Sequence, residues 1–179
     1  PPTASPAAQA DNAALAASLN WADEQDFDFA SRGFLGSIPD GKIRNAKGDV
    51  LRDLADGAQF TGPAPATVNP SLWRNATLVA KHGLFQVADG IWQVRGLDLA
   101  NMTVIRGNSG WIIVDPLTGA ESAKAAMALV TDKLGKRPVV AVIYTHSHVD
   151  HFGGVLGVVN PAEVAAGKVQ IIAPEGFLE

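Results

Sequence analysis

The chain contains 179 residues, of which 47% are hydrophobic and 18% are charged, and its formal net charge is −4 at neutral pH. These values fit a soluble globular protein with a real core and exclude global disorder. The sequence has no cysteine, which excludes disulfides, thiolate zinc sites, iron–sulfur clusters and cysteine nucleophiles. A pI near 5.5 argues against nucleic acid as a partner. No apolar run approaches the roughly 20 residues needed to span a bilayer.

The first part of the chain divides into two segments. Residues 1–22 are rich in alanine and proline and are predicted to be a flexible or helical tail. This tail fits either the stretch that follows a cleaved signal peptide or an ordinary alanine- and proline-rich end. The first alternative implies a periplasmic or secreted protein, and the second leaves a cytoplasmic location open. Residues 23–71 contain many glycines and prolines and are predicted to be a mostly irregular segment that wraps a surface.

Residues 72–179 show the periodic patterns of regular structure. Strands are predicted at residues 84–88, 91–95, 102–106 and 111–114, with Asp89-Gly90 as a hairpin turn. Thr118 and Glu121 form a capping-box pattern before a helix whose apolar residues repeat from Ala120 to Leu134. A buried strand at 139–144, a short helix at 162–166 and a strand at 169–173 complete the pattern. A strand meander followed by strand–helix–strand predicts an α/β fold with a mixed sheet covered by helices.

The loop after the predicted buried strand carries the chemistry. Three of the four histidines of the chain occur there, as His146, His148 and His151, together with Asp150. His146 and His148 point to the same side of an extended segment, and Asp150 and His151 follow where the chain turns. One pair can hold one metal ion and the other pair a second one. Imidazole and carboxylate without thiolate favour zinc, then iron or manganese. The alternative is a set of structural histidines, but this pattern at the end of a strand favours metal binding.

The pattern His-x-His-x-Asp-His, followed by Gly153-Gly154, resembles the metal-binding signature of the metallo-β-lactamase superfamily. Asp115 resembles the earlier acidic residue of that superfamily, which orients the metal site; the alternative is a turn-forming aspartate before proline. Three further blocks, at residues 26–34, 67–74 and 96–103, resemble the zinc-dependent (type III) alkylsulfatases of the superfamily. The resemblance runs from about Asp26 to Glu179.

The resemblance implies a function. His146 and His148 would bind one zinc ion, and Asp150 and His151 the other, giving two zinc ions per complete subunit. Asp150 would also be the catalytic residue that orients a metal-bound hydroxide for attack on an alkyl sulfate ester, with alcohol and inorganic sulfate as products. The same resemblance implies detergent degradation and a homodimer. The alternatives are another hydrolase of the superfamily (a lactonase, thioesterase or β-lactamase) and a metal-binding fragment without catalysis.

The ligand set is incomplete within this sequence. The superfamily fold is an αββα sandwich of two similar halves, and only the N-terminal half is expected in this chain, over residues 72–179. After His151 there is no histidine, and the remaining carboxylates are Glu163, Glu175 and Glu179. Two protein ligands leave a catalytic zinc ion under-coordinated. The chain is therefore predicted to be the N-terminal portion of a longer enzyme, with the other ligands and the sulfate-binding residues beyond Glu179.

Overall fold

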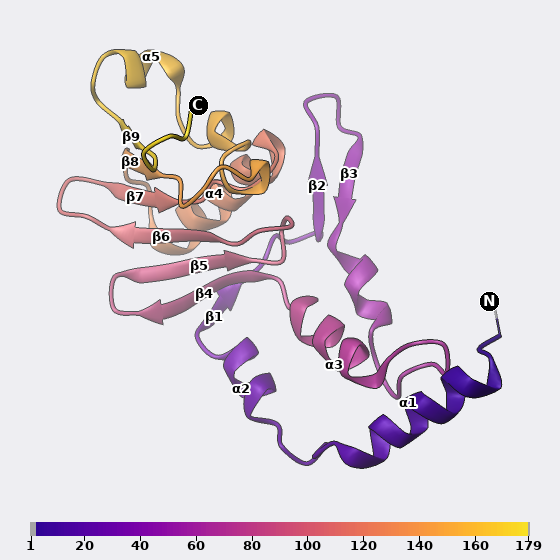
Figure 1. Cartoon of the computed structure of the whole chain (residues 1–179). Helices are drawn as coiled ribbons and strands as arrows, with labels where there is room; N and C mark the ends of the chain where they lie inside the picture. The colour runs from indigo at the N-terminus through magenta and orange to yellow at the C-terminus, as the bar shows by residue number, and fades with distance from the viewer. Residues whose placement is uncertain (1–2, 179) are drawn as a thin grey trace. The chain divides into compact units, whose positions relative to one another are not determined.

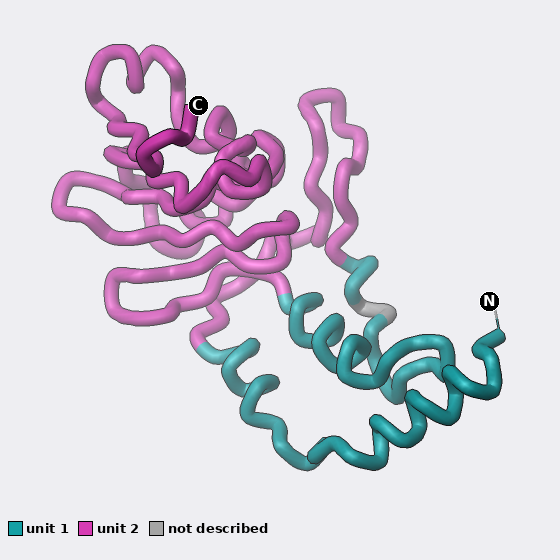
Figure 2. Tube along the Cα trace, in the orientation of Figure 1, with its two compact units in different colours: residues 1–32, 55–81 teal, residues 33–54, 82–179 magenta. Residues whose placement is uncertain are grey.

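The computed structural model describes residues 3–178, apart from the side chains of residues 58 and 59. The chain forms two compact units, which Figure 2 shows in different colours. Unit 1 comprises residues 1–32 and 55–81, and unit 2 comprises residues 33–54 and 82–179. Each unit therefore contains two stretches that are separate in the sequence.

Unit 1 is built from helices. They are α1 (Pro6–Ser18), α2 (Gln25–Ser31) and α3 (Pro70–Val79), with the 3-10 helix η1 (Leu54–Gln59) at the boundary with unit 2. The Ser5 side chain accepts a hydrogen bond from the backbone N–H of Ala8 and starts α1, and Asn69 starts α3 in the same way. A proline follows each of these two caps, where its missing N–H costs nothing. The predicted flexible or helical tail is thus helical over most of its length.

The segment predicted to be mostly irregular, residues 23–71, contains more regular structure than expected. Besides α2 and η1 it forms β1 (Phe34–Gly36), β2 (Lys42–Arg44) and β3 (Val50–Asp53). β2 pairs with β3 in a separate two-stranded sheet, and β1 pairs with a strand from residues 83–88. Strands of three or four residues are too short for a period-two pattern, so their pairing partners determine them.

Unit 2 contains a seven-stranded mixed sheet in the order β1-β4-β5-β6-β7-β8-β9 (Figure 1). Besides β1, its strands are β4 (Gly83–Ala88), β5 (Ile91–Arg95), β6 (Met102–Arg106), β7 (Trp111–Val114), β8 (Val139–Ile143) and β9 (Gln170–Ile172). Pairing is antiparallel from β1 to β7, whereas β7, β8 and β9 run parallel. The predicted strands of residues 72–179 are confirmed to within two residues, and so is the mixed α/β fold.

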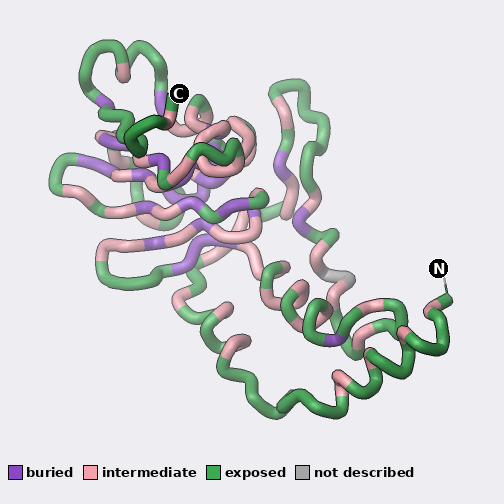
Figure 3. Tube along the Cα trace, viewed as in Figure 1, coloured by how far each residue is buried: buried purple, intermediate pink, exposed green. Residues whose placement is uncertain are grey.

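The hydrophobic core of unit 2 lies between the sheet and α4 (Ala120–Leu134) (Figure 3). Alternate residues of the central strands are buried there: Trp92, Val94, Met102, Val104, Trp111 and Ile113. α4 contributes Ala123, Ala126, Leu129 and Val130. The predicted capping box of α4 is wrong, because Gly119 is the N-cap residue and no side chain of the helix start caps it.

The remaining elements follow β8. They are the 3-10 helices η2 (Val149–His151) and η3 (Val155–Gly157), and α5 (Pro161–Ala165). Because β7 and β8 are parallel neighbours, the loops that follow them meet at the same edge of the sheet. Among the described residues, no helix is long and apolar enough to cross a membrane.

Candidate functional site

The turn between β7 and α4 forms one side of the site. Asp115 and Leu117 have φ angles of 56° and 68°, in the left-handed region, which aspartate adopts more readily than most residues and leucine adopts rarely. For Leu117 such a conformation costs roughly 1–2 kcal/mol, so the surroundings must hold it. The backbone N–H of Asp115 donates to the carbonyl of Ile143 at 3.0 Å, and the Leu117 side chain is fully buried. The turn therefore presents the Asp115 carboxylate from a fixed backbone.

The loop after β8 approaches this turn closely enough to require glycine. A Cβ atom at Gly154 would lie 2.1 Å from the Pro116 carbonyl oxygen, and one at Gly153 would lie 2.5 Å from that of Thr118. The N–H of Gly154 donates to the carbonyl of Leu117 at 2.8 Å. The two glycines that follow the histidine motif are thus needed because two backbones come into direct contact.

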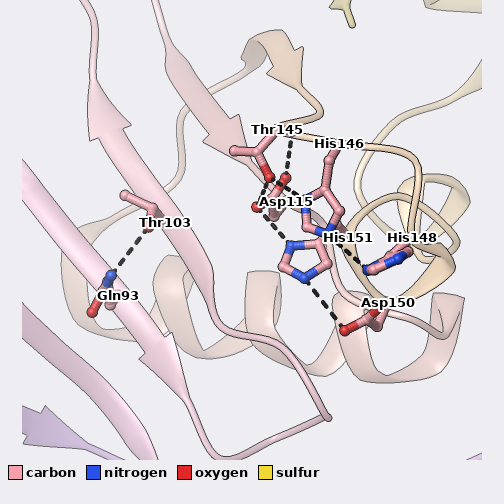
Figure 4. A network of polar contacts seen from close by, with 8 residues as sticks. All are labelled: Gln93, Thr103, Asp115, Thr145, His146, His148, Asp150 and His151. Atoms are coloured by element: carbon pink, nitrogen blue, oxygen red, sulfur yellow. Dashed lines mark hydrogen bonds and ion pairs between the residues drawn. The ribbon is translucent and has the colours of Figure 1, made fainter. Parts of the chain in front are cut away.

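Asp115 is the centre of the polar network (Figure 4). Its side chain is buried, with 8% of the residue exposed. Oδ1 accepts a hydrogen bond from the backbone N–H of Thr145 at 2.9 Å, and Oδ2 accepts one from the Thr145 hydroxyl at 2.7 Å. Oδ2 also lies 2.8 Å from Nδ1 of His151. A carboxylate can only accept here, so the proton of His151 lies on Nδ1 and the lone pair of Nε2 is left available.

Thr145 fixes which ring nitrogen of His146 carries the proton. The Thr145 hydroxyl has one proton, which it donates to Asp115, so its oxygen accepts from Nδ1 of His146 at 3.0 Å. The lone pair of His146 therefore lies on Nε2. Sequence analysis did not identify Thr145 as a site residue. The feature of the sequence that could have identified it is a hydroxyl side chain directly before the first histidine of the motif.

The four predicted ligands come together as two pairs. Nε2 of His146 lies 3.1 Å from Nδ1 of His148, and Nε2 of His151 lies 3.3 Å from Oδ2 of Asp150. Two ligands of a tetrahedral zinc ion, each bound at about 2.0–2.1 Å, are separated by about 3.3 Å. Both pairs thus have the spacing of two zinc ligands, and their donor atoms are the nitrogen and oxygen types that zinc accepts. Among the described residues, no three histidine, aspartate or glutamate side chains lie close enough together to hold one metal ion.

An aromatic cluster flanks the histidine loop. The ring of Tyr144, the residue before the loop, lies 5.8 Å from the ring of Phe152 and 5.4 Å from that of Phe177. Burial raises the pKa of the Tyr144 phenol above its ordinary value, so the group stays neutral at physiological pH. Tyr144 therefore supports the loop by packing. Trp92 and Trp111 are also core residues, with their rings edge to face at 5.7 Å.

Comparisons with known proteins find relatives over most of this sequence. Residues 95–179 match the family model of the metallo-beta-lactamase superfamily. The chain is 51% identical to a linear primary-alkylsulfatase and 48% identical to an (R)-specific secondary-alkylsulfatase, both from Pseudomonas sp.. The matches cover 98% and 95% of this chain, and 26% of each relative.

A solved structure shows the same similarity in three dimensions. The stereoselective inverting sec-alkylsulfatase Pisa1 from Pseudomonas sp. superposes with a TM-score of 0.92 at 46% identity. The superposition covers 99% of this chain and 28% of that protein. The predicted resemblance to the alkylsulfatases of the metallo-β-lactamase superfamily is confirmed, and this chain spans about a quarter of the length of these relatives.

Proposed function

We propose that the full-length protein hydrolyses alkyl sulfate esters to an alcohol and inorganic sulfate at a zinc centre. The observation that carries the proposal is the arrangement of His146, His148, Asp150 and His151 in two ligand pairs at the end of parallel strands. The similarity to two alkylsulfatases at about half identity supports the choice of substrate class.

Each side chain has a role in this proposal. Nε2 of His146 and Nδ1 of His148 would hold one zinc ion, and Oδ2 of Asp150 and Nε2 of His151 would hold the other. When bound, zinc supplies Lewis-acid stabilisation of negative charge and lowers the pKa of a bound water to about 7. The second carboxylate oxygen of Asp150 would accept a hydrogen bond from the attacking nucleophile and so orient it. Asp115 and Thr145 would keep the lone pairs of His151 and His146 directed at the ligand positions.

The proposed substrates are alkyl sulfates as a class, primary and secondary. The relatives named for primary and for secondary substrates are similar to this chain to nearly the same degree, 51% and 48%. Two zinc ions per subunit and a homodimer are further parts of the proposal that rest on the family resemblance. A periplasmic or secreted location rests on the alanine- and proline-rich residues 1–22, and a cytoplasmic location is the alternative. Elemental analysis and sedimentation of the full-length protein test the zinc content and the homodimer.

A side-by-side assay tests the substrate class. Zinc-loaded full-length protein should release sulfate from alkyl sulfates such as dodecyl sulfate and show little turnover of a β-lactam, a lactone or a thioester. Faster turnover of any of these three than of every alkyl sulfate would contradict the proposal. Full activity in protein without a transition metal would contradict the zinc centre.

A further inference from the structure

The loop between β5 and β6 lies at the same edge of the sheet as the candidate metal centre. β6 runs antiparallel to β7, and Thr103 near the start of β6 pairs with Val114 at the end of β7. Residues 96–101 therefore enter the sheet beside the turn that carries Asp115.

Asp98 connects this loop to the start of α4. Its Oδ2 accepts a hydrogen bond from the backbone N–H of Gly119 at 3.3 Å, and its Oδ1 accepts one from the N–H of Leu99 at 2.7 Å. Gly119 is the N-cap residue of α4 and has no side chain to cap the helix. The Asp98 carboxylate instead binds the backbone N–H of this N-cap residue, the group that the acidic residue of a capping box would bind, and its negative charge lies at the positive end of a 15-residue helix.

The protonation state of Asp98 fits this contact. Burial alone would raise the pKa of the carboxyl, but the hydrogen bonds that it accepts, from Leu99 and Gly119 among others, lower the pKa below its ordinary value. Asp98 is therefore ionised at neutral pH and can act only as an acceptor.

Asp98 binds the end of the turn formed by residues 115–119, which contains the positive φ angles of the site. Asp115 and Leu117 are in the left-handed region, so the backbone of residues 115–119 needs external anchors. Gly154 provides one through its bond to the Leu117 carbonyl, and Asp98 provides another at Gly119. A change at either anchor is expected to move the Asp115 carboxylate, since the turn between them is short.

We propose that Asp98 is a positioning residue of the metal centre, an inference that rests on the proposed zinc function. It does not contact the ligands. Its effect passes through Gly119 and the turn to Asp115, then directly to His151 and through Thr145 to His146. Loss of the Asp98 carboxylate weakens zinc binding by loosening the group that fixes both histidines.

The test uses the full-length protein with Asp98→Ala and Asp98→Asn. Asp89→Asn is the matched control, because Asp89 is an exposed carboxylate at the β4–β5 hairpin and is paired with Arg106. Zinc affinity is measured by chelator competition, and ligand geometry by the absorption spectrum of the cobalt-substituted protein. Asp98→Ala should bind zinc about 10-fold more weakly, as for other residues that orient a ligand, and its cobalt spectrum should change. Asp98→Asn keeps one carbonyl acceptor and should recover part of the affinity, and Asp89→Asn should match the wild type.

A lower melting temperature of Asp98→Ala with wild-type zinc affinity and cobalt spectrum would overturn the proposal, as would an equal loss in Asp89→Asn. If Asp98→Ala does not fold, Asp98→Glu decides, because it keeps the charge but displaces the carboxylate by one methylene; unchanged zinc affinity in that variant overturns the proposal. A wild-type protein that binds zinc but hydrolyses no alkyl sulfate contradicts only the proposed function. A wild-type protein that binds no zinc overturns both.

Discussion

Unit 1 and unit 2 differ in the contacts that stabilise each of them internally. Among the described residues, Pro70 is the one buried residue of unit 1, whereas unit 2 has a continuous core of aromatic and aliphatic side chains. The candidate metal centre lies in unit 2, where two loop backbones touch across Gly153 and Gly154. A site whose ligands must be placed to within a fraction of an ångström is therefore built on the close-packed unit.

Unit 1 depends on a few polar and aromatic contacts. Arg74 of α3 forms an ion pair with Asp26 of α2 at 2.6 Å, and its guanidinium lies 4.7 Å from the ring centre of Phe27. α1, α3 and residues 62–68 line an open pocket of about 690 Å³. Contacts of this kind position the helices of unit 1 without forming a continuous buried core.

The largest expected effect is on catalysis in unit 2. Asp150→Asn should keep the fold but lower kcat at least roughly 10²-fold, because it removes a charged ligand and the group that orients water. Asp132→Asn, in an exposed residue of α4, is the control and should be unaffected. Steady-state kinetics and zinc content are measured together. Near-normal turnover with unchanged zinc content would reject the role of Asp150.

The second effect compares glycines of the two units. Gly154→Ala should destabilise unit 2 by about 1–3 kcal/mol through overpacking against the Pro116 carbonyl, and zinc content should fall. Gly62→Ala in unit 1 has nothing within 4 Å of its added Cβ, and its φ of 69° adds only backbone strain of about 1 kcal/mol. Its zinc content should not change. Thermal melting and elemental analysis give both quantities. Equal zinc loss in the two variants would remove the distinction between the units.

The smallest effect concerns acid pH in unit 1. The hydrogen bond and charge of Arg74 lower the pKa of Asp26 below 3.8. The stabilising contribution is therefore complete above pH 3.8 and is lost as the pH falls through the folded-state pKa. Asp26→Asn should show at neutral pH the lower hydrogen-exchange protection factor of α2 that is expected of the wild type only in acid, with zinc content unchanged. The change is small because exposed ion pairs contribute little.

Asp40→Asn is the control for this measurement. Asp40 also has a lowered pKa and an ion pair, with Arg44, but it belongs to unit 2. Its replacement should leave the exchange of α2 as it is. Wild-type protection of α2 in Asp26→Asn at every pH would contradict the prediction.

Local patterns predicted much of unit 2. The strands from β4 to β9 are short runs rich in apolar and β-branched residues, α4 has apolar residues at helical spacing, and the four proposed ligand residues lie within six consecutive positions. Asp115 was expected as an orienting residue through the family resemblance, and its bond to His151 agrees with that expectation. Short-range chemistry of this kind is visible in sequence because the residues that interact are close in the chain or follow a fixed period.

One feature that sequence analysis missed depends on a contact between distant residues. The N-cap residue of α4, Gly119, donates its N–H to Asp98, 21 positions earlier, and the predicted capping box of Thr118 and Glu121 does not form. Nothing in the pattern around Asp115 and Leu117 indicates their positive φ angles, which the neighbouring loop stabilises. The strands between residues 34 and 53 were missed because each is only three or four residues long.

One carboxylate serves both ligand pairs, since Asp115 binds His151 directly and His146 through Thr145. Substitutions on the two sides of Asp115 should therefore be epistatic, because each changes the carboxylate that the other depends on. A directed-evolution library that alters these positions singly and adds the effects would misjudge their combinations. Co-varying residues 115, 145 and 151 as one block would sample the arrangements in which both pairs remain aligned.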